Sequence, residues 1–575
     1  MKKMSGKVIT FEKDESIYLD LAEEAADEGR FADAVSYAYT AWKNTRSKEA
    51  AKELGFLYAD MKLYALSDKY WFYYLEKAKE GEAYLAFEEL MLNNIYKGDN
   101  LLVDYYFKER IERPGKGNRN DFGEKLAGLA MEKKEFEKPF RIVYPPEQAD
   151  FTIELENARQ NMCLGRFGAA LKLLVKIPEG ARQYKEALKE IAIVYFELKQ
   201  EEEASETCKQ ILSEFGEDAV AYGILSRICF IKDKKRSAYL YEKAMNLLDI
   251  ENIGDVVKLA SCAIEQSDFI RSAELLEKIL KEAPFNTEML LSYSQALINS
   301  GEYEKAKESL KTLVRIDSSN VVYKYYLELC SALISGERGD ELPVSIEEGL
   351  PIKREKEIKK ILASIHRRQK ESGEAFLKKE SVKDALKEGA CCGNYNLAHE
   401  CVSVLACMKD PDARAFCSDM LMDEKIDSDI KRVIVYLRIL EGGKKKIAFS
   451  TDGVFVKLKT YKLLCEEKNP ELYVPYAYVL SKLTPVEESE QKRLAITADR
   501  ILSAFADDSI EYVREISALI TAEFLKDRIT LSGAAEMFGV DEESVRRVIE
   551  KTGIGIELLQ NKKRKRNGKN ESKNN

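Results

Sequence analysis

The stretch Ala158–Ala170, ARQNMCLGRFGAA, decides the fold, because four later stretches of the chain repeat its pattern. Each stretch ends in an alanine that directly follows a turn. These alanines, separated by 34, 34, 35 and 33 residues, are Ala170, Ala204, Ala238, Ala273 and Ala306. A period near 34 residues is typical of stacked helical hairpins, in which two amphipathic helices pack and neither can bury its apolar face alone.

A second small residue stands twelve positions before each of these alanines. The five are Ala158, Ala192, Ser226, Ser261 and Ser294. Two small side chains facing each other let the helices of a hairpin approach closely. Gly165 and Gly301 lie in the turns, where glycine accepts the left-handed conformation that ends a helix. The pattern therefore predicts helical hairpins with these small residues at the crossing points.

These units resemble the tetratricopeptide repeat, whose consensus has the same small residues, turn and alanine. The resemblance covers residues 152–335, and EGRFADA with Ala34 and LGFLYADMKLYALS (54–67) extend it toward the N-terminus, with a looser unit at 84–107. It implies a curved helical solenoid whose concave groove binds a protein or peptide partner.

The chain is therefore expected to be all-α and to fall into seven segments. In order, these are N-terminal tetratricopeptide-like repeats (1–111), an irregular connection (112–150), the repeat array (151–335), a linker (336–356), a helical region with a β-hairpin at 446–459 (357–526), a helix-turn-helix-like module (527–560) and a disordered basic tail (561–575). The region 357–526 weakly resembles HEAT and armadillo units. The hairpin is predicted from apolar alternation around a TDG turn.

Composition limits the function classes. The chain has 575 residues, 91 Lys and Arg against 100 Asp and Glu, and a net charge of -9, which argues against a protein that coats nucleic acid. Twelve prolines and 30 glycines are too few for a strand-rich or collagen-like chain. The start has no apolar core of a secretory signal and no stretch of 18 apolar residues occurs, so we expect a cytoplasmic protein with reduced thiols.

The candidates for chemistry are few. Five cysteines, Cys391, Cys392, Cys401, Cys407 and Cys417, surround His399, but no pair has the C-x2–4-C spacing of a zinc site, so packing is the favoured role. The other histidine, His366, lies on a basic helical face. The PGKG run at 114–117 lacks the rest of a phosphate-binding loop. The sequence predicts no enzyme, metal, cofactor or small-molecule substrate.

The first helix of each repeat lines the concave side of such an array. By register, the groove candidates are Arg159, Lys189, Arg227, Lys258, Gln295 and Asn299. This mixture suits an acidic or C-terminal carboxylate-bearing segment, and equally a merely solvated surface. The Lys/Asn clamp of chaperone-binding tetratricopeptide domains is not reproduced, because Ile193 and Cys262 stand where asparagine is expected.

Residues 529–552, ITLSGAAEMFGVDEESVRRVIEKT, resemble a DNA-binding helix-turn-helix. Ala535 is expected at the helix crossing, Gly539 in the turn, Asp541 as the cap of the second helix, and Val540, Val545 and Val548 in the core. The resemblance implies nucleic-acid contacts by Ser544, Arg546, Arg547 and Lys551, joined by the basic tail residues Lys562, Lys563, Arg564, Lys565 and Arg566.

Charge leaves two hypotheses for this segment. Residues 528–560 carry four basic and six acidic side chains, whereas 561–575 carry seven basic and one acidic. The module alone is thus a poor match for phosphates, and a structural or protein-docking cap is the competing interpretation. The first hypothesis for the whole chain is a non-enzymatic scaffold binding a partner through its repeats. The alternative is a DNA-binding regulator with the repeats as a sensor or interaction arm.

Overall fold

The computed structural model describes residues 14–79, 81–112, 150–163, 165–337, 342–344, 346, 349–367, 375–441, 446–467, 469–483, 488–505, 512–525 and 528–553. The chain divides into two compact units, residues 1–356 and 357–575. Helices dominate both units, as predicted.

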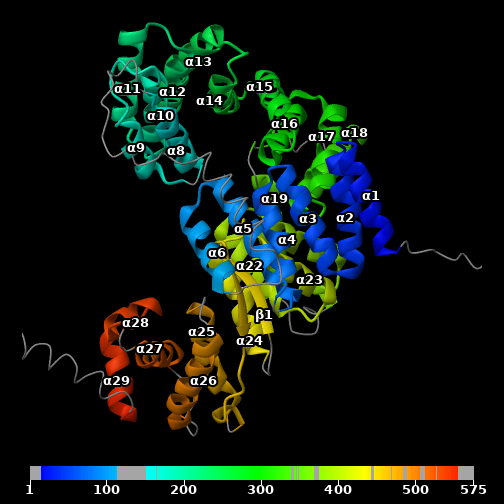
Figure 1. Ribbon diagram of the computed structural model, residues 1–575, viewed down its shortest axis with the longest axis vertical. Coiled ribbons are helices and arrows are strands. Elements are labelled where there is room, and N and C mark those ends of the chain that lie inside the picture. The colour runs from blue at the N-terminus through cyan, green and yellow to red at the C-terminus, as the bar shows by residue number, and fades with distance from the viewer. Residues whose placement is uncertain are drawn as a thin grey trace, which may run out of the picture. The chain divides into compact units, whose positions relative to one another are not determined.

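The predicted array is a row of antiparallel helical hairpins in the first unit (Figure 1). Its helices are α8 (Thr152–Cys163), α9 (Phe167–Leu174), α10 (Tyr184–Glu197), α11 (Glu201–Phe215), α12 (Ala219–Cys229), α13 (Lys234–Leu247), α14 (Ile253–Glu265), α15 (Phe269–Glu282), α16 (Thr287–Ser300), α17 (Tyr303–Ile316) and α18 (Val321–Ser335). The odd-numbered helices α9 to α17 are the second helices of their hairpins. The even-numbered helices are the first, and α18 stands after the last complete hairpin.

The small residues at the helix crossings are buried, with a change of register in the middle repeats. Ala158, Ala192 and Ser294 are fully buried, as predicted. In the hairpin α12–α13, however, Ser237 is the buried residue and Ala238 is exposed, because Ser226 and Ser237 exchange hydrogen bonds across the crossing. In α14, Ala260 is buried and Ser261 is exposed. The predictions of Ala238 and Ser261 as buried contacts are therefore wrong by one position each.

Three further hairpins form the N-terminal part of the first unit. They consist of α1 (Glu15–Asp27), α2 (Phe31–Thr45), α3 (Lys48–Asp60), α4 (Tyr64–Lys77), α5 (Ala83–Lys97) and α6 (Asn100–Glu112). Ala34 is fully buried, as its anchor position predicts. Ser67 is also fully buried and donates to the Gly55 carbonyl at 2.7 Å. A β-carbon on Gly55 would lie 2.7 Å from the Trp71 ring, so glycine is what allows α3 and α4 to pack this closely.

The N-terminal hairpins touch both ends of the later array. At the far end, α2 packs on α17, and the buried Tyr58 hydroxyl of α3 donates to the Ile316 carbonyl at 2.6 Å. At the near end, Arg166, which precedes α9, pairs with Asp99 at 2.9 Å. The repeats of this unit therefore close on themselves instead of forming an open row.

Two segments between the helical regions were predicted to be irregular, the connection 112–150 and the linker 336–356. Residues 113–149, which make up nearly all of the predicted irregular connection, lie outside the described residues. The predicted linker 336–356 is too long, because α19 (Ile352–His366) begins within it.

The second unit continues with α21 (Glu380–Ala390), α22 (Tyr395–Cys407), α23 (Pro411–Met422), α24 (Ser428–Leu440), α25 (Tyr473–Lys482), α26 (Glu488–Leu502), α27 (Val513–Phe524), α28 (Leu531–Met537) and α29 (Glu542–Thr552), with short 3-10 turns at Cys465–Glu467, Pro470–Leu472 and Ser503–Phe505. Its likeness to HEAT or armadillo units stays a prediction.

The predicted β-hairpin is confirmed. Strands β1 (Lys446–Thr451) and β2 (Val454–Lys459) pair antiparallel, with Thr451 opposite Val454. Asp452 and Gly453 both have positive φ, as a two-residue hairpin turn requires. One face of the hairpin is buried against α23, α24 and α26, which explains why so small a sheet is stable.

Candidate protein-binding surface

The predicted groove cations of the first half of the array meet carboxylates of the array itself. Arg159 bonds Glu190 at 2.9 Å. Lys189 lies 3.0 Å from Asp255, and Lys258 lies 3.4 Å from Glu190. All three cations therefore belong to one network of ion pairs that runs from α8 through α10 to α14.

This network joins helices that are two repeats apart. Lys189 and Glu190 belong to α10, whereas Asp255 and Lys258 belong to α14. The Lys189 side chain is only 4% exposed and that of Lys258 only 8%. Side chains from two first helices thus meet across the intervening α12, and the concave face of this stretch is filled by the protein's own charges.

The pKa values of Lys189, Glu186 and Asp218 are shifted in the direction that favours their ionised forms. Burial alone would lower the pKa of Lys189, but its hydrogen bond to Glu186 and the nearby Asp218 and Asp255 outweigh burial and raise that pKa. Burial would likewise raise the pKa of Asp218 and Glu186, yet the lysines around them lower both. Each partner stabilises the charge of the other, as expected for buried groups that are paired.

Arg227 is also paired, outside that network. Its guanidinium lies 3.0 Å from Glu265 and 3.7 Å from Glu197, and it stacks 4.3 Å from the centre of the Phe196 ring. The carboxylate partners of the four predicted groove cations outnumber them. The expectation that this mixture suits an acidic segment is therefore not supported here, because such a segment would have to displace carboxylates already in place.

The last two predicted groove residues, both on α16, lie apart from these ion pairs. Gln295 is fully buried. Asn299 holds another part of the chain: its amide nitrogen donates to the Val344 carbonyl at 2.8 Å, and the Val344 amide donates to its oxygen at 2.7 Å. The side-chain amide thus satisfies both main-chain groups of one residue in the linker.

The linker has further contacts in this place. The Tyr326 hydroxyl of α18 donates to the Gly349 carbonyl at 3.1 Å. The side chains of Val344 and Leu350 are buried. The linker therefore contacts the first helices α16 and α18 through hydrogen bonds of Val344 and Gly349, and it buries the side chains of Val344 and Leu350. Asn299 was a predicted groove residue, but its contact with the linker could not be predicted from the sequence, since Val344 lies 45 residues away.

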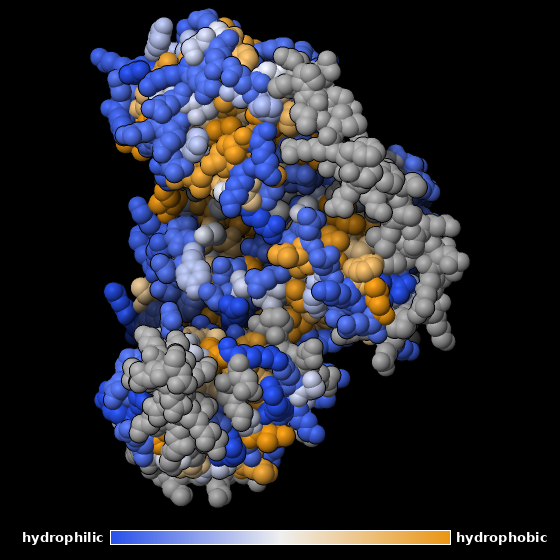
Figure 2. All heavy atoms as spheres, turned by 60° about the vertical axis from the view of Figure 1, so that its left-hand side comes forward, coloured by the Kyte–Doolittle hydropathy of each residue, from blue (hydrophilic) through white to orange (hydrophobic). Residues whose placement is uncertain are grey.

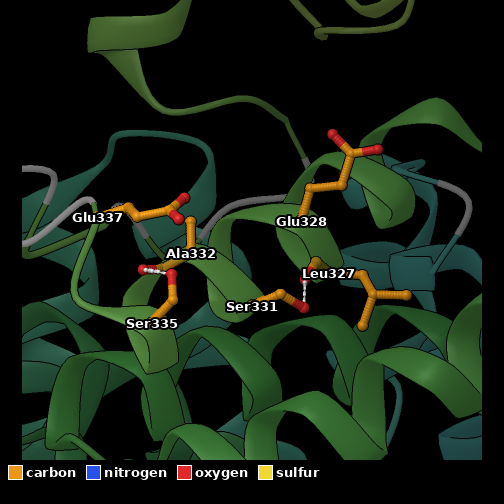
Figure 3. Close-up of a pocket in the computed structure, with 6 residues that line it drawn as sticks. All are labelled: Leu327, Glu328, Ser331, Ala332, Ser335 and Glu337. Atoms are coloured by element: carbon orange, nitrogen blue, oxygen red, sulfur yellow. Dashed lines mark hydrogen bonds between the residues drawn. The ribbon is translucent and has the colours of Figure 1, made fainter.

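A shallow hollow opens on α18 (Figure 3). It is lined by Leu327, Glu328, Ser331, Ala332, Ser335 and Glu337. The Ser331 and Ser335 hydroxyls donate to carbonyls of the same helix, Leu327 at 2.9 Å and Ala332 at 3.0 Å. The hollow is open and offers no converging polar groups, so it lacks the features of a small-molecule site.

Apolar side chains also reach the surface of the array. Hydrophilic residues cover most of the face shown in Figure 2, with apolar ones gathered in patches between them. In the middle repeats Ile231, Tyr239 and Ile270 are among the most exposed large apolar residues. Exposed apolar patches of this kind are typical of surfaces that bind proteins.

In the cysteine cluster three thiols are packed in the interior, whereas Cys391 is half-buried and Cys407 is exposed. Cys392, Cys401 and Cys417 are buried, and burial raises the pKa of Cys401 to about 12 and of Cys417 to about 11. A β-carbon on Gly389 of α21 would lie 2.5 Å from the Cys401 sulfur, so the thiol fills a close contact between α21 and α22. Among the residues that the structure describes, no group of His, Cys, Asp and Glu side chains is arranged to hold a metal ion.

The C-terminal helices α28 and α29 meet at the predicted turn. Gly539 has a φ of 66°, and the Asp541 carboxylate accepts from the Ser544 amide at 2.8 Å, so the predicted turn and cap are confirmed. Ala535 is buried, as predicted. Val540, however, is only half-buried.

The core between these two helices is completed by a residue that the sequence did not suggest. Phe538 is buried in place of Val540, because its ring packs edge-on against Tyr478 of α25, with centroids 5.1 Å apart. Val545 and Val548 of α29 are buried, as predicted. The helix pair is therefore packed onto the rest of the second unit.

The predicted nucleic-acid residues are only partly available. The Ser544 hydroxyl bonds Asp541 at 2.7 Å, and Arg546 pairs with Glu542 of its own helix. Arg547 is exposed. The side chain of Lys551 and the tail residues Lys562, Lys563, Arg564, Lys565 and Arg566 lie outside the described residues.

Comparison with known proteins supports the repeat assignment over part of the chain. Residues 263–325, which include α15, α16 and α17, match the family model described as tetratricopeptide repeat. The resemblance predicted from the 34-residue period is thus confirmed for this stretch. No curated protein shows a significant match to the chain.

Solved structures of repeat proteins also align with the chain. Yeast Tom70 is 12% identical over 90% of this chain and 96% of its own, with a TM-score of 0.25. The C-terminal part of a tetratricopeptide repeat-containing protein from Cytophaga hutchinsonii is 14% identical over 47% of this chain and 97% of its own, with a TM-score of 0.19. These TM-scores lie far below 0.5, so the alignments carry no conclusion about this chain.

Within the part of the chain that the structure describes, no helix is both long and apolar enough to span a membrane.

Proposed function

We propose that this protein is a non-enzymatic cytoplasmic scaffold that binds an extended segment of a partner protein in the concave groove of its repeats. One observation carries the proposal: the surface of α16 and α18 already holds part of the chain's own linker, through the paired hydrogen bonds between Asn299 and Val344. An amide side chain that bonds both the N–H and the C=O of one residue recognises the main chain of a ligand. Such recognition does not depend on which side chain the ligand carries at that position.

The proposed groove lies in the last repeats, because the two halves of the array differ. Around Lys189 the concave face is closed by ion pairs between α10 and α14. Over α16 and α18 the contacts to the linker are two apolar anchors and neutral hydrogen bonds. A segment with apolar side chains suits that surface, since Val344 and Leu350 of the linker are both buried there.

The experiment is a crosslinking pull-down from native cytosol with the full chain, read for proteins. Asn299→Ala removes both hydrogen bonds to a seated segment and is expected to abolish capture of the specific partner. Asn157→Ala, on the exposed face of α8, is the matched control and should capture as wild type does. If all three proteins retrieve the same set, the groove over α16 is not the binding site.

A second candidate function is DNA binding by α28 and α29. The observation that favours it is the short helix pair with a glycine turn and an aspartate cap, which presents the exposed Arg547 on the second helix. Against it stand the acidic residues at the start of that helix, Asp541, Glu542 and Glu543.

The test of this candidate is a salt-titrated binding assay of the full chain with duplex DNA. Arg547→Ala should weaken binding and make it less dependent on salt, because one phosphate contact is lost. Arg315→Ala removes the same charge from an exposed site in the first unit and serves as control. Equal affinity of both variants and wild type would leave only nonspecific contact by the tail.

A further inference from the structure

The linker segment is held as a ligand would be held, through Val344 and Gly349 among its described residues. Both main-chain groups of Val344 bond the Asn299 side chain, at 2.7 and 2.8 Å, and the Gly349 carbonyl accepts from Tyr326. These bonds come from two successive first helices of the array, α16 and α18. The linker therefore contacts two neighbouring repeats.

Two apolar side chains anchor the segment. Val344 and Leu350 are each 3% exposed, six positions apart. Between them Ile346 and Gly349 are only partly buried. Main-chain hydrogen bonds with apolar anchors at intervals are the means by which proteins recognise extended peptides with limited sequence specificity.

We propose that the linker, seated through Val344, Gly349 and Leu350, is an intramolecular ligand that occupies a binding site over α16 and α18, and that a partner binds there by replacing it. The partner is an extended peptide with two apolar residues six positions apart, matching Val344 and Leu350. This inference rests on the proposed function, of which it names the regulation.

The covalent connection favours the state in which the linker occupies the site. The segment is tethered on both sides, to the end of α18 at Ser335 and to the start of α19 at Ile352. A short tether gives an effective concentration on the order of millimolar. A free peptide of similar intrinsic affinity competes poorly against it, because its apparent affinity falls by the fraction of molecules with an open site.

The test uses the full chain and a fluorescent peptide of residues 341–351, ELPVSIEEGLP, in an anisotropy titration. The double variant Val344→Asp, Leu350→Asp expels the segment, because it would bury two carboxylates in apolar positions. It should bind the peptide at least 10-fold more tightly than wild type. Adding Asn299→Ala should remove this gain, and a peptide with aspartate in place of its valine should not bind.

The matched control carries the same two charges elsewhere. Ile153→Asp, Val175→Asp changes two exposed apolar residues of the same unit and should bind the peptide as wild type does. Equal binding by wild type and by the Val344, Leu350 variant would overturn the inference. So would a Val344, Leu350 variant that unfolds cooperatively, as wild type does, and still fails to bind.

A measurement on the unchanged protein covers the case in which that variant does not fold. The Val344 amide should exchange its hydrogen at least 10-fold faster than the amides of Leu297 and Ile298 in α16, because the segment leaves while the helix stays folded. Equal protection would show that the segment is part of the core, and would overturn the inference. The peptide titration needs no cellular partner, so a failed pull-down with successful peptide binding would count against the proposed function alone.

Discussion

At the scale of single residues, the concave face of the array is governed by buried charge. Lys189 is surrounded by three carboxylates, of Glu186, Asp218 and Asp255, within 3.5 Å. Desolvation of such groups is costly, so each charge is tolerated only because its partners are present. Lys189, which the sequence suggested as a contact for a partner, therefore stabilises the array itself.

Lys189→Ala is expected to destabilise the first unit by roughly 3 kcal/mol, because it leaves buried carboxylates without their cation. The free energy of unfolding from urea titration measures the effect. Lys232→Ala is the control: Lys232 pairs with Glu201 on the surface, and its removal should leave stability at the wild-type value. Similar losses in the two variants would mean that the Lys189 network contributes no more than a surface pair.

The same network predicts how stability depends on pH. The pKa values of Asp218 and Glu186 lie below their ordinary values of 3.8 and 4.5, so their contribution is present above pH 4.5 and is lost as pH falls through the folded values. The pKa of Lys189 lies above 10.5, so its contribution is present below pH 10.5 and is lost at higher pH.

Urea titrations at a series of pH values measure this dependence. Wild type should lose stability below about pH 4.5 more steeply than Lys189→Met, in which the carboxylate pKa values return toward normal. Lys232→Met should follow the wild-type curve. Parallel curves for Lys189→Met and wild type would contradict the assignment of the acid loss to this network.

At the scale of elements, the close crossing of α3 and α4 depends on Gly55. Gly55→Ala places a methyl group 2.7 Å from the Trp71 ring and should destabilise the protein by about 1–3 kcal/mol. Gly168→Ala, in α9 with no atom within 4 Å of the added carbon, should be neutral or stabilising by up to about 1 kcal/mol. Thermal unfolding compares the two, and a neutral Gly55→Ala would show that the crossing can widen at no cost.

The elements are also the level at which sequence reasoning succeeded best. In a repeat array, small residues at the helix crossings recur at a regular spacing. This spacing can be read directly from the sequence and predicts where the helices lie. The sequence predicted Ala238 and Ser261 at two helix crossings, but the buried residues are Ser237 and Ala260, one position earlier in each case. Spacing alone cannot tell which of two adjacent small residues enters the crossing.

The candidate site was predicted only in part. The sequence placed Asn299 among the groove residues, and the structure gives it contacts with another part of the chain, whereas the predicted groove residue Gln295 of the same helix is fully buried. The partners of the cations were not predictable, because Lys189 and Asp255 meet only if the array curves enough to bring α10 and α14 together. The contact between Val344 and Asn299 likewise depends on the path of the linker, which the sequence does not predict.

At the scale of the whole first unit, the N-terminal hairpins connect both ends of the later array. An open array of repeats unfolds in a graded way, since each repeat contacts only its neighbours. Here Tyr58 of α3 reaches Ile316, 258 residues later, and Arg166 reaches Asp99. Loss of one such contact should therefore destabilise two helices that are far apart in the sequence.

Tyr58→Phe tests this coupling. It removes the buried hydrogen bond to the Ile316 carbonyl and should cost about 1 kcal/mol. Because the bond joins α3 to the end of α17, hydrogen exchange should quicken both in residues 48–60 and in residues 303–316. Tyr74→Phe is the control, since the Tyr74 hydroxyl bonds the nearby Glu82 carbonyl at 3.4 Å and its loss should affect only α4 and α5. Faster exchange in 48–60 without any change in 303–316 would show that the ends of the array touch without stabilising each other.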